Sequence, residues 1–440
     1  MFREISEKLL KWKDSSRRKP LLITGVRQCG KTYSIKSFGE NHFENMVYIN
    51  FESSSKYGAI FEYDFDTERI VNEIELVEKG KITPGRTLLI FDEIQECPRA
   101  ITSLKYFCEN MRELHIVCAG SLLGVALKRE NISFPVGKVN RMQMYPMNFK
   151  EFAIASGAEN YIRILSDWQC DREIPDLYTV PLKKLLGEYS AVGGMPEAVA
   201  EWISSRDSSA VDDIQQDILS DYEDDFSKHA PVAEIEKIRL IWKSIPLQLA
   251  KENNKFVFSH VQKGKRAHEL EAALQWLSNA GLVHIHNLIE NTDVPLSAHA
   301  DLTYFKVFMS DVGLLRKRAG ISFASIINGD NNLNGYKGAL AENYVLCELL
   351  SQDIKSYFWR SGNTAEVDMV FEHESDIYPV EVKSADNARA KSYKLFCSRY
   401  SPERGFKVSL KNIGVNDCEG TETLSIPLYM TWRISSELNK

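Results

Sequence analysis

Residues 25–32 read Gly25-Val26-Arg27-Gln28-Cys29-Gly30-Lys31-Thr32, which matches the phosphate-binding loop pattern G-x-x-x-x-G-K-S/T. An apolar run, Leu21 to Thr24, precedes this loop, and we predict a helix from Thr32 to Phe38 after it. The two glycines let successive N–H groups turn inward, and the helix N-terminus adds partial positive charge there. All eight residues are therefore candidate ATP-binding residues. Lys31 would reach the β- and γ-phosphates, and the Thr32 hydroxyl would bind Mg²⁺.

Two carboxylates follow a second apolar run, Leu88-Leu89-Ile90-Phe91-Asp92-Glu93. A wholly apolar strand needs both faces buried, as in a parallel sheet. Ligands bind at the carboxyl ends of such strands. We therefore expect this strand to neighbour the strand that precedes the phosphate loop. Asp92 would hold Mg²⁺, and Glu93 would be catalytic because it polarises the attacking water.

Composition limits the function. The chain has 440 residues, a formal net charge of −7, and 44% hydrophobic and 26% charged residues. These values are typical of a globular protein with about two to four domains. The charge gives no global basis for nucleic-acid binding, so any such site must be local. The eight cysteines form no C-x-x-C pair, and no apolar stretch is long enough for a signal region or a membrane span. We expect a reduced, cytoplasmic protein without a membrane partner.

Apolar runs alternate with helical spacing up to about residue 155. We predict strands and helices, in addition to those above, at Met46–Phe51, Ile70–Val77, Thr87–Phe91, Ala100–Met111 and Leu114–Ala119. This order implies a doubly wound parallel sheet. It resembles the additional-strand, catalytic-glutamate class of P-loop ATPases. Ser121, after the last strand, is a candidate catalytic residue that senses the γ-phosphate, although a helix cap fits equally well.

The stretch from Phe134 to Phe152 indicates the family. It contains Tyr145-Pro146-Met147-Asn148-Phe149 and resembles the end of the ATPase module in AAA-type proteins with a C-terminal DUF4143 region. That family has a Tyr-Pro-Leu-Ser-Phe-like turn here, so Met147 and Asn148 depart mildly from it. A Gly-Gly-Phe-Pro-Glu-like turn of the family is matched by Gly193-Gly194-Met195-Pro196-Glu197. The resemblance covers nearly the whole chain and implies an AAA-type fold that binds ATP. A homo-oligomer is one possible state of the protein.

The middle of the chain combines helices with a predicted hairpin. Residues 156–232 read as a lid-like helical region. After them we predict helices and strands at Ile235–Glu252, Phe256–Phe258 (a short strand-like run), Glu269–Ala280, Leu282–Leu288 and Tyr304–Met309. Two helices and a two-stranded wing are typical of a winged helix. Lys263, Lys265 and Arg266 precede its last helix and could contact DNA phosphates, although winged helices also serve as spacers.

The last region carries a short acidic and basic motif. A helix from Gly338 to Leu350 precedes a strand at Ser356–Arg360 and two strands that carry Asp368 and then Glu381-Val382-Lys383. This is the D…(D/E)-x-K arrangement of the restriction-nuclease-like fold, and Glu342 fits its helix carboxylate. Asp368 and Glu381 would bind Mg²⁺ through oxygen ligands. Lys383 shares a strand face with Glu381 and would orient or deprotonate water. The catalytic set would be Asp368, Glu381, Lys383 and Glu342.

These patterns predict an α/β chain with four regions. They are an AAA-type ATPase domain with a parallel sheet (1–155), a helical region (156–232), a winged-helix region (233–330) and an α+β restriction-nuclease-like domain (331–440). We expect an ATPase that uses ATP and Mg²⁺ and acts on nucleic acid. Two alternatives stay open. One is a nucleotide-switched DNA- or protein-binding regulator with an inert tail, and the other is an ATP-driven protein remodeller.

Overall fold

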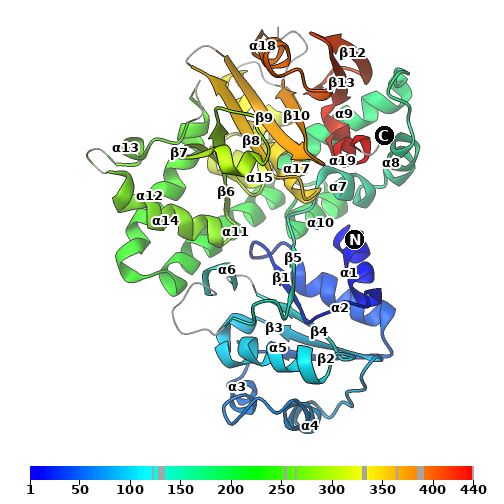
Figure 1. Cartoon of the computed structure of the whole chain (residues 1–440), viewed down its shortest axis with the longest axis vertical. Helices are drawn as coiled ribbons and strands as arrows, with labels where there is room; N and C mark the ends of the chain where they lie inside the picture. Colours follow the sequence, from blue (N-terminus) through cyan, green and yellow to red (C-terminus); the bar gives the residue numbers. More distant parts are fainter. Residues whose placement is uncertain are drawn as a thin grey trace. The chain divides into compact units, whose positions relative to one another are not determined.

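Alternation of apolar strands with amphipathic helices organises the first part of the chain. The computed structural model describes residues 1–120, 123–126, 134–251, 255–262, 264, 266–329, 334–362, 365–383 and 391–438. Two units are present, one of residues 2–146 and 279–282, the other of Met1, 147–278 and 283–440. The smaller unit contains a five-stranded parallel sheet (Figure 1) made of β1 (Leu21–Thr24), β2 (Asn45–Asn50), β3 (Thr87–Asp92), β4 (His115–Ala119) and β5 (Asn140–Gln143). Its helices are α1 (Ile5–Asp14), α2 (Lys31–His42), α3 (Lys56–Ile60), α4 (Thr67–Glu78), α5 (Pro98–Asn110), the short α6 (Leu123–Ala126) and the 3₁₀ turn η1 (Ile94–Glu96).

Both faces of this sheet are covered. Side chains alternate along a strand, so Leu89 and Phe91 of β3 join the buried cluster formed with α3, α4 and α5. Leu88 points to the other face, where it lies against Gly39 of α2. The predicted doubly wound sheet is thereby confirmed, and its predicted strands and helices are all present with ends shifted by a few residues.

One expectation about this sheet is wrong. The strand order is β2-β3-β4-β1-β5, so β4 separates the phosphate-loop strand β1 from the acidic strand β3. Cys118 of β4 pairs with Leu22 on one side and with Phe91 on the other. The reason is burial: all five residues of β4 are buried, so β4 needs a strand on each edge and a helix layer on each face.

The larger unit begins with helices. They are α7 (Phe149–Ala155), α8 (Glu159–Ser166), α9 (Asp176–Val192), α10 (Pro196–Ser205), α11 (Ser208–His229), α12 (Val232–Leu249), α13 (Phe258–Val261) and α14 (Ala267–Asn279). The helical character predicted for residues 156–232 is therefore found. The strand-like run predicted at 256–258 is wrong, because α13 begins at Phe258. Phe256 instead packs its ring against Phe305 and donates its N–H to the Phe305 carbonyl at 2.9 Å.

A second sheet runs through the rest of the larger unit (Figure 1). Its eight strands are β6 (Val283–Ile289), β7 (Ala300–Met309), β8 (Ser356–Ser361), β9 (Ala365–His373), β10 (Asp376–Val382), β11 (Arg404–Ser409), β12 (Gly414–Cys418) and β13 (Thr421–Pro427), in the order β12-β13-β11-β10-β9-β8-β6-β7. The remaining helical segments are α15 (Val312–Arg318), α16 (Phe323–Ile327), α17 (Asn334–Ser351), α18 (Lys391–Tyr400), α19 (Ile434–Glu437) and the 3₁₀ turns η2 (Leu296–His299) and η4 (Leu428–Arg433).

The predicted hairpin of the winged helix exists, but it is not a separate wing. β6 and β7 pair antiparallel as expected, and β6 then pairs in parallel with β8 through Leu288 and Ile289. Both residues are buried, with at most 4% of their surface exposed. The hairpin therefore extends the C-terminal sheet, and the predicted limit at residue 330 separates regions that share one sheet.

Two glycines form a close backbone crossing in the larger unit. Gly194 donates its N–H to Asp311 at 2.6 Å, and its carbonyl accepts the Met147 N–H at 2.7 Å. A Cβ on Gly194 would lie 2.0 Å from the Met147 carbonyl oxygen, and one on Gly193 would lie 2.2 Å from the Asp311 carboxylate. The Gly-Gly turn read from the sequence is thus a packing requirement, and no side chain fits at either position.

Replacing Gly194 with alanine should lower the free energy of unfolding by about 3 kcal/mol or more, because the new methyl group can be accommodated only by moving backbone. Urea denaturation followed by circular dichroism measures the loss. Gly187→Ala on α9 is the control, since a Cβ there meets nothing within 4 Å. That change should stabilise by up to about 1 kcal/mol through helix propensity. Equal stabilities of the two variants would contradict the crossing.

Candidate functional site

The phosphate-binding loop connects β1 to α2 and needs glycine for two different reasons. A Cβ on Gly25 would lie 2.2 Å from the Met144 carbonyl oxygen of the neighbouring chain segment. Gly30 adopts a left-handed conformation, with φ of 93°, immediately before the first residue of α2. Arg3, which the sequence reading did not single out, is buried and donates to the carbonyls of Cys29 and Tyr145, each at 2.7 Å. Arg3 thereby anchors the phosphate-binding loop to the segment that contains Tyr145.

Lys31 and Thr32, the predicted phosphate and Mg²⁺ ligands, are the first two residues of α2. Lys31 is 7% exposed, and its ammonium group donates to the carbonyls of Gly25 and Val26 at 2.9 and 2.8 Å. The ammonium group of Lys31 therefore lies against the phosphate-binding loop. The Thr32 hydroxyl donates to Asp92 at 2.8 Å. A hydroxyl and a carboxylate in contact form the oxygen donor set that suits Mg²⁺, so these residues fit a magnesium-bound nucleotide.

Asp92 has a second partner that the sequence reading missed. Tyr48 of β2 donates its hydroxyl to the same Asp92 oxygen at 2.8 Å. Burial and this hydrogen bond raise the pKa of Tyr48 to about 12, so it stays a donor at neutral pH. In the parallel register Asn50 pairs with Asp92, which places Tyr48 two residues back on the same face of β2. Tyr48 is thus placed to fix the orientation of the Asp92 carboxylate.

Tyr48→Phe should reduce the turnover number for ATP about 10-fold while leaving the Michaelis constant nearly unchanged. One hydrogen bond to a charged group is lost, and a loss near 1.4 kcal/mol corresponds to that factor. Steady-state ATP hydrolysis measures both constants. Tyr63→Phe is the matched control because Tyr63 is 85% exposed. Parental turnover in Tyr48→Phe would show that Asp92 needs no help from this hydroxyl.

Glu93 follows Asp92 at the end of β3. Its backbone is left-handed, with φ of 47°, and its N–H lies 3.1 Å from Asp92 Oδ1. The Gln95 amide donates to Glu93 Oε2 at 2.6 Å, an interaction not expected from the sequence. Gly120, at the end of β4, packs against the Gln95 amide oxygen. Ser121, the predicted γ-phosphate sensor, lies outside the described residues.

Asp368 of β9, Glu381 of β10 and Lys383, which directly follows β10, lie close together. The Lys383 ammonium lies 2.7 Å from Glu381 and 3.8 Å from Asp368. Asp368 also accepts the Val382 N–H at 2.7 Å. Glu381 is 4% exposed, and its second oxygen, Oε2, is buried without a hydrogen-bond partner among the described residues. A cation would satisfy that oxygen, so the two carboxylates fit a divalent metal.

The charges of this cluster perturb each other. Burial, with Glu381 and Glu342 nearby, raises the pKa of Asp368 well above its usual range. Burial also raises the pKa of Glu381. Burial alone would lower the pKa of Lys383, but Asp368 and Glu381 outweigh it and raise the value. Two buried carboxylates that disfavour each other's charge are stabilised by positive charge, whether from Lys383 or from a metal ion.

Glu342, the predicted helix carboxylate, is bound by a lysine that the sequence reading missed. Lys306 of β7 is 1% exposed and contacts Glu342 at 3.0 Å and Glu366 at 2.8 Å. Burial alone would lower the pKa of Lys306, but Glu342 and Glu366 outweigh it and raise the value. Within the described part of the chain, no group of three or more His, Cys, Asp or Glu side chains is arranged to hold a metal. A metal here would take Asp368 and Glu381 plus water or substrate oxygens, as Mg²⁺ commonly does.

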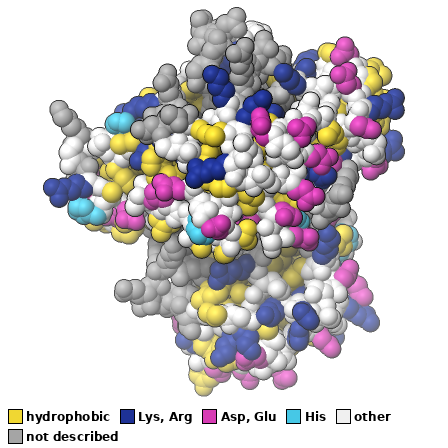
Figure 2. Space-filling model, turned by 45° about the horizontal axis from the view of Figure 1, so that its top comes forward, with side chains coloured by type: hydrophobic (Ala, Val, Ile, Leu, Met, Phe, Trp, Pro, Cys, Tyr) yellow, Lys and Arg dark blue, Asp and Glu magenta, His cyan; other side chains and the backbone are white. Residues whose placement is uncertain are grey.

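The predicted DNA contacts are only partly visible. Lys263 and Lys265 lie outside the described residues, and Arg266 lies at the start of α14, where its N–H donates to Glu269. Figure 2 shows basic and acidic side chains interspersed over one face of the molecule, in keeping with the net charge of −7. Among the described helices, none has the length and apolar character that crossing a membrane requires.

Comparisons with known proteins match three parts of the chain to families. Residues 17–153 match an AAA domain family, 183–325 a domain of unknown function (DUF8612), and 337–429 a domain of unknown function (DUF4143). The AAA and DUF4143 parts of the predicted resemblance are thereby confirmed. An uncharacterized protein of Haemophilus influenzae is 25% identical over 202 residues, which cover 44% of this chain and 43% of that protein. The chain thus matches less than half the length of this curated relative.

Solved structures are also among the matches, and two of them have the following similarity to the chain. The Walker-type ATPase PABY2304 of Pyrococcus abyssi has a TM-score of 0.45 at 14% identity, covering 72% of this chain and 95% of that one. The Aeropyrum pernix ORC1 protein, solved in complex with DNA, has a TM-score of 0.29 at 14% identity, covering 74% and 91%.

Proposed function

We propose that this protein is a Mg²⁺-dependent ATPase whose nucleotide cycle controls a metal-dependent, nucleic-acid-cleaving centre in its C-terminal sheet. The AAA domain match over residues 17–153 supports the ATPase part. The second part rests on one observation, the cluster of Asp368, Glu381 and Lys383 with a buried carboxylate oxygen that lacks a partner among the described residues.

At the nucleotide site, each residue of the motifs has a separate proposed role. The loop N–H groups and Lys31 would bind the phosphates, and Thr32 and Asp92 would hold a magnesium ion, which would neutralise phosphate charge. Tyr48 keeps Asp92 oriented. Glu93 would accept a proton from the attacking water, and the Gln95 amide, which donates to Glu93, orients its carboxylate.

The strand and helix order supports a nuclease-like reading of the C-terminal part. It runs α17, β8, β9, β10, α18, β11, and the four strands are neighbours in the order β8-β9-β10-β11. Asp368 and Glu381 lie on the two central strands of this group, and Lys383 directly follows β10. Asp368 and Glu381 would bind the metal, which would supply an activated water, and Lys383 would orient that water toward a phosphodiester. Lys263, Lys265 and Arg266 remain our proposed DNA contacts near α14.

A second function is favoured by Lys306. Its buried ammonium group already neutralises Glu342 and Glu366 beside the cluster, as a metal would. A centre whose carboxylate charges are neutralised by its own lysines could bind a nucleic-acid strand without cutting it. The chain would then be a nucleotide-switched nucleic-acid-binding regulator with an inert tail.

One experiment separates these functions. The purified protein is assayed for ATP hydrolysis and for cleavage of DNA and RNA panels, single- and double-stranded, with Mg²⁺ or Mn²⁺. ATP turnover with metal-dependent cleavage is the expected result. Turnover with binding but no cleavage on any substrate establishes the regulator instead. Absence of ATP turnover under all conditions would refute the ATPase that both functions share.

A further inference from the structure

A cavity of about 820 Å³ lies beside the carboxylate cluster in the larger unit. Glu381 and Lys383 line it from the end of β10, and Lys407 lines it from β11. The segment from Ser409 to Val415, between β11 and β12, forms another part of the wall. The cavity therefore opens directly onto the residues that we propose to hold metal and water.

Three further lysines, Lys183, Lys407 and Lys411, line this cavity. Lys407 lies over the Tyr393 ring, 4.9 Å from its centre, and interacts electrostatically with Glu381. Lys183 and Lys411 form no ion pair among the residues that the structure describes, whereas Lys383 is already paired with Glu381. Two other acidic residues, Glu173 and Asp417, line the same cavity, so the excess of positive charge is local and modest. Unpaired lysines in a cavity attract an anionic ligand. Such a ligand would lie next to the buried carboxylates.

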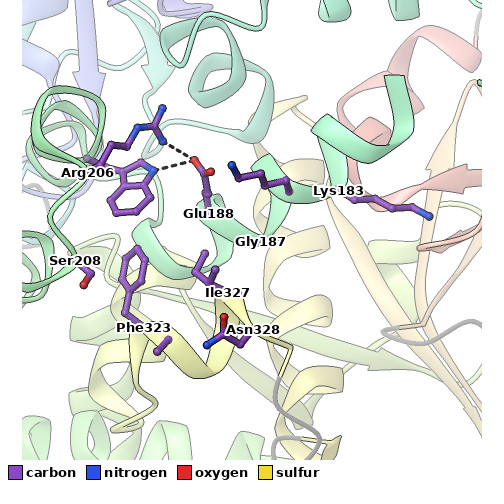
Figure 3. A pocket seen from close by; sticks show the side chains of 11 residues that line it. Lys183, Gly187, Glu188, Arg206, Ser208, Phe323, Ile327 and Asn328 are labelled. Carbon is purple, nitrogen blue, oxygen red and sulfur yellow. Dashed lines mark hydrogen bonds and ion pairs between the residues drawn. The ribbon is translucent and has the colours of Figure 1, made fainter. Parts of the chain in front are cut away.

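Lys183 comes from α9, outside the C-terminal sheet. In Figure 3, which shows a different cavity lined by Glu188, Phe323 and other residues, the Lys183 side chain points away from Glu188 and Arg206. It lines both cavities and marks where they adjoin. The chain just before α9 is tied to the β11–β12 segment, because the Asn412 side chain bonds to both the N–H and the carbonyl of Ile174, at 3.0 and 2.8 Å. This wall of the cavity is thus fixed in place.

We propose that this cavity binds the phosphodiester backbone of a single nucleic-acid strand, with Lys183 and Lys411 contacting phosphates that flank the bond presented to Glu381 and Lys383. The inference rests on the proposed function and names its substrate class. A cavity of this volume suits a ligand of a few dozen heavy atoms. This volume can enclose a short piece of one strand but not a duplex segment, so we expect a single strand to bind more tightly. Among the described residues that line the cavity, none is aromatic. The described lining therefore offers phosphate contacts rather than base contacts, and we expect binding to be independent of sequence.

The test uses the full chain and fluorescein-labelled 12-nucleotide DNA and RNA strands, with fluorescence anisotropy in EDTA to prevent cleavage. The variants are Lys183→Glu and Lys411→Glu. Lys184→Glu is the matched control, because Lys184 is the next residue of α9, is also exposed, and lines the other cavity but not this one. Affinity is measured over a series of salt concentrations, and each protein is also assayed for ATP turnover.

Lys183→Glu and Lys411→Glu should each weaken binding about 5- to 10-fold at low salt and reduce the salt slope by about 0.7 to 1. Lys184→Glu should bind like the parent, and a duplex should bind more weakly than a strand. Equal binding by the variants of Lys183 and Lys184 would overturn the strand path, as would a duplex bound as tightly as a strand or a parent that binds no strand. Failure of the ATPase proposal is distinguishable from failure of the strand-binding proposal. Only the former would leave the parent protein without ATP turnover.

Discussion

Replacing Glu93 with glutamine should leave ATP bound but lower its turnover about 10²-fold or more. The amide keeps the size and hydrogen-bonding reach of the side chain but cannot accept a proton from water, and a positioned general base contributes about 10²- to 10⁴-fold. The geometry favours a functional role over a structural one, because Glu93 is only partly buried and its described contacts are polar.

Calorimetry with ATP and a phosphate-release assay together measure this prediction. Glu96→Gln is the matched control, since Glu96 lies three residues on, is exposed and makes the same change of charge. The control should bind and hydrolyse ATP like the parent. If Glu93→Gln turns over ATP at the parental rate, water is activated by another residue. If it no longer binds ATP, Glu93 supports the loop itself.

Local patterns in the sequence predicted most of the smaller unit. The phosphate loop, its flanking strand and helix, and the Asp92-Glu93 pair follow from short-range chemistry, because a glycine loop between strand and helix depends on neighbours in sequence. The order of the strands in the sheet does not follow from such local chemistry. β4 lies between β1 and β3 because it pairs with residues more than 20 positions away in the sequence. Tyr48 was missed for the same reason. Its role depends on the register of β2 against β3, which no pattern within β2 reveals.

The larger unit shows where sequence reasoning stops. Asp368, Glu381 and Lys383 were singled out by the D…(D/E)-x-K spacing on two predicted strands, and the antiparallel pairing of β9 with β10 brings them together. Lys306 was not predicted, although it contacts Glu342 and Glu366, because it lies on β7, in a hairpin that was interpreted as a wing. Only two residue pairs, Leu288 with Phe358 and Ile289 with Trp359, join that hairpin to β8. Each partner is apolar in a strand of ordinary length, so nothing in either segment specifies the pairing.

Replacing Asp368 with asparagine should remove a metal-dependent gain in stability and all strand cleavage. In the parent, Mn²⁺ or Mg²⁺ should raise the melting temperature in the absence of nucleotide, because metal bound only to the folded state stabilises it by about 2.7 kcal/mol at 100 times its dissociation constant. Asparagine can still accept the Val382 N–H that Asp368 accepts at 2.7 Å, so the fold around it should persist. Asp376→Asn, an exposed change on the same hairpin, is the control and should keep the metal response.

Lys383→Ala completes this prediction because it separates metal binding from chemistry. Without the lysine, Glu381 loses its partner at 2.7 Å, and the buried carboxylates should depend more strongly on a metal for their charge balance. The metal-dependent rise in melting temperature should therefore persist or grow, while cleavage should stop for want of a group that orients water. Metal binding in the parent without cleavage of any nucleic acid would favour the regulator with an inert tail. A parent whose melting temperature is unchanged by either metal would refute the metal centre, and with it the nuclease, while leaving the ATPase untouched.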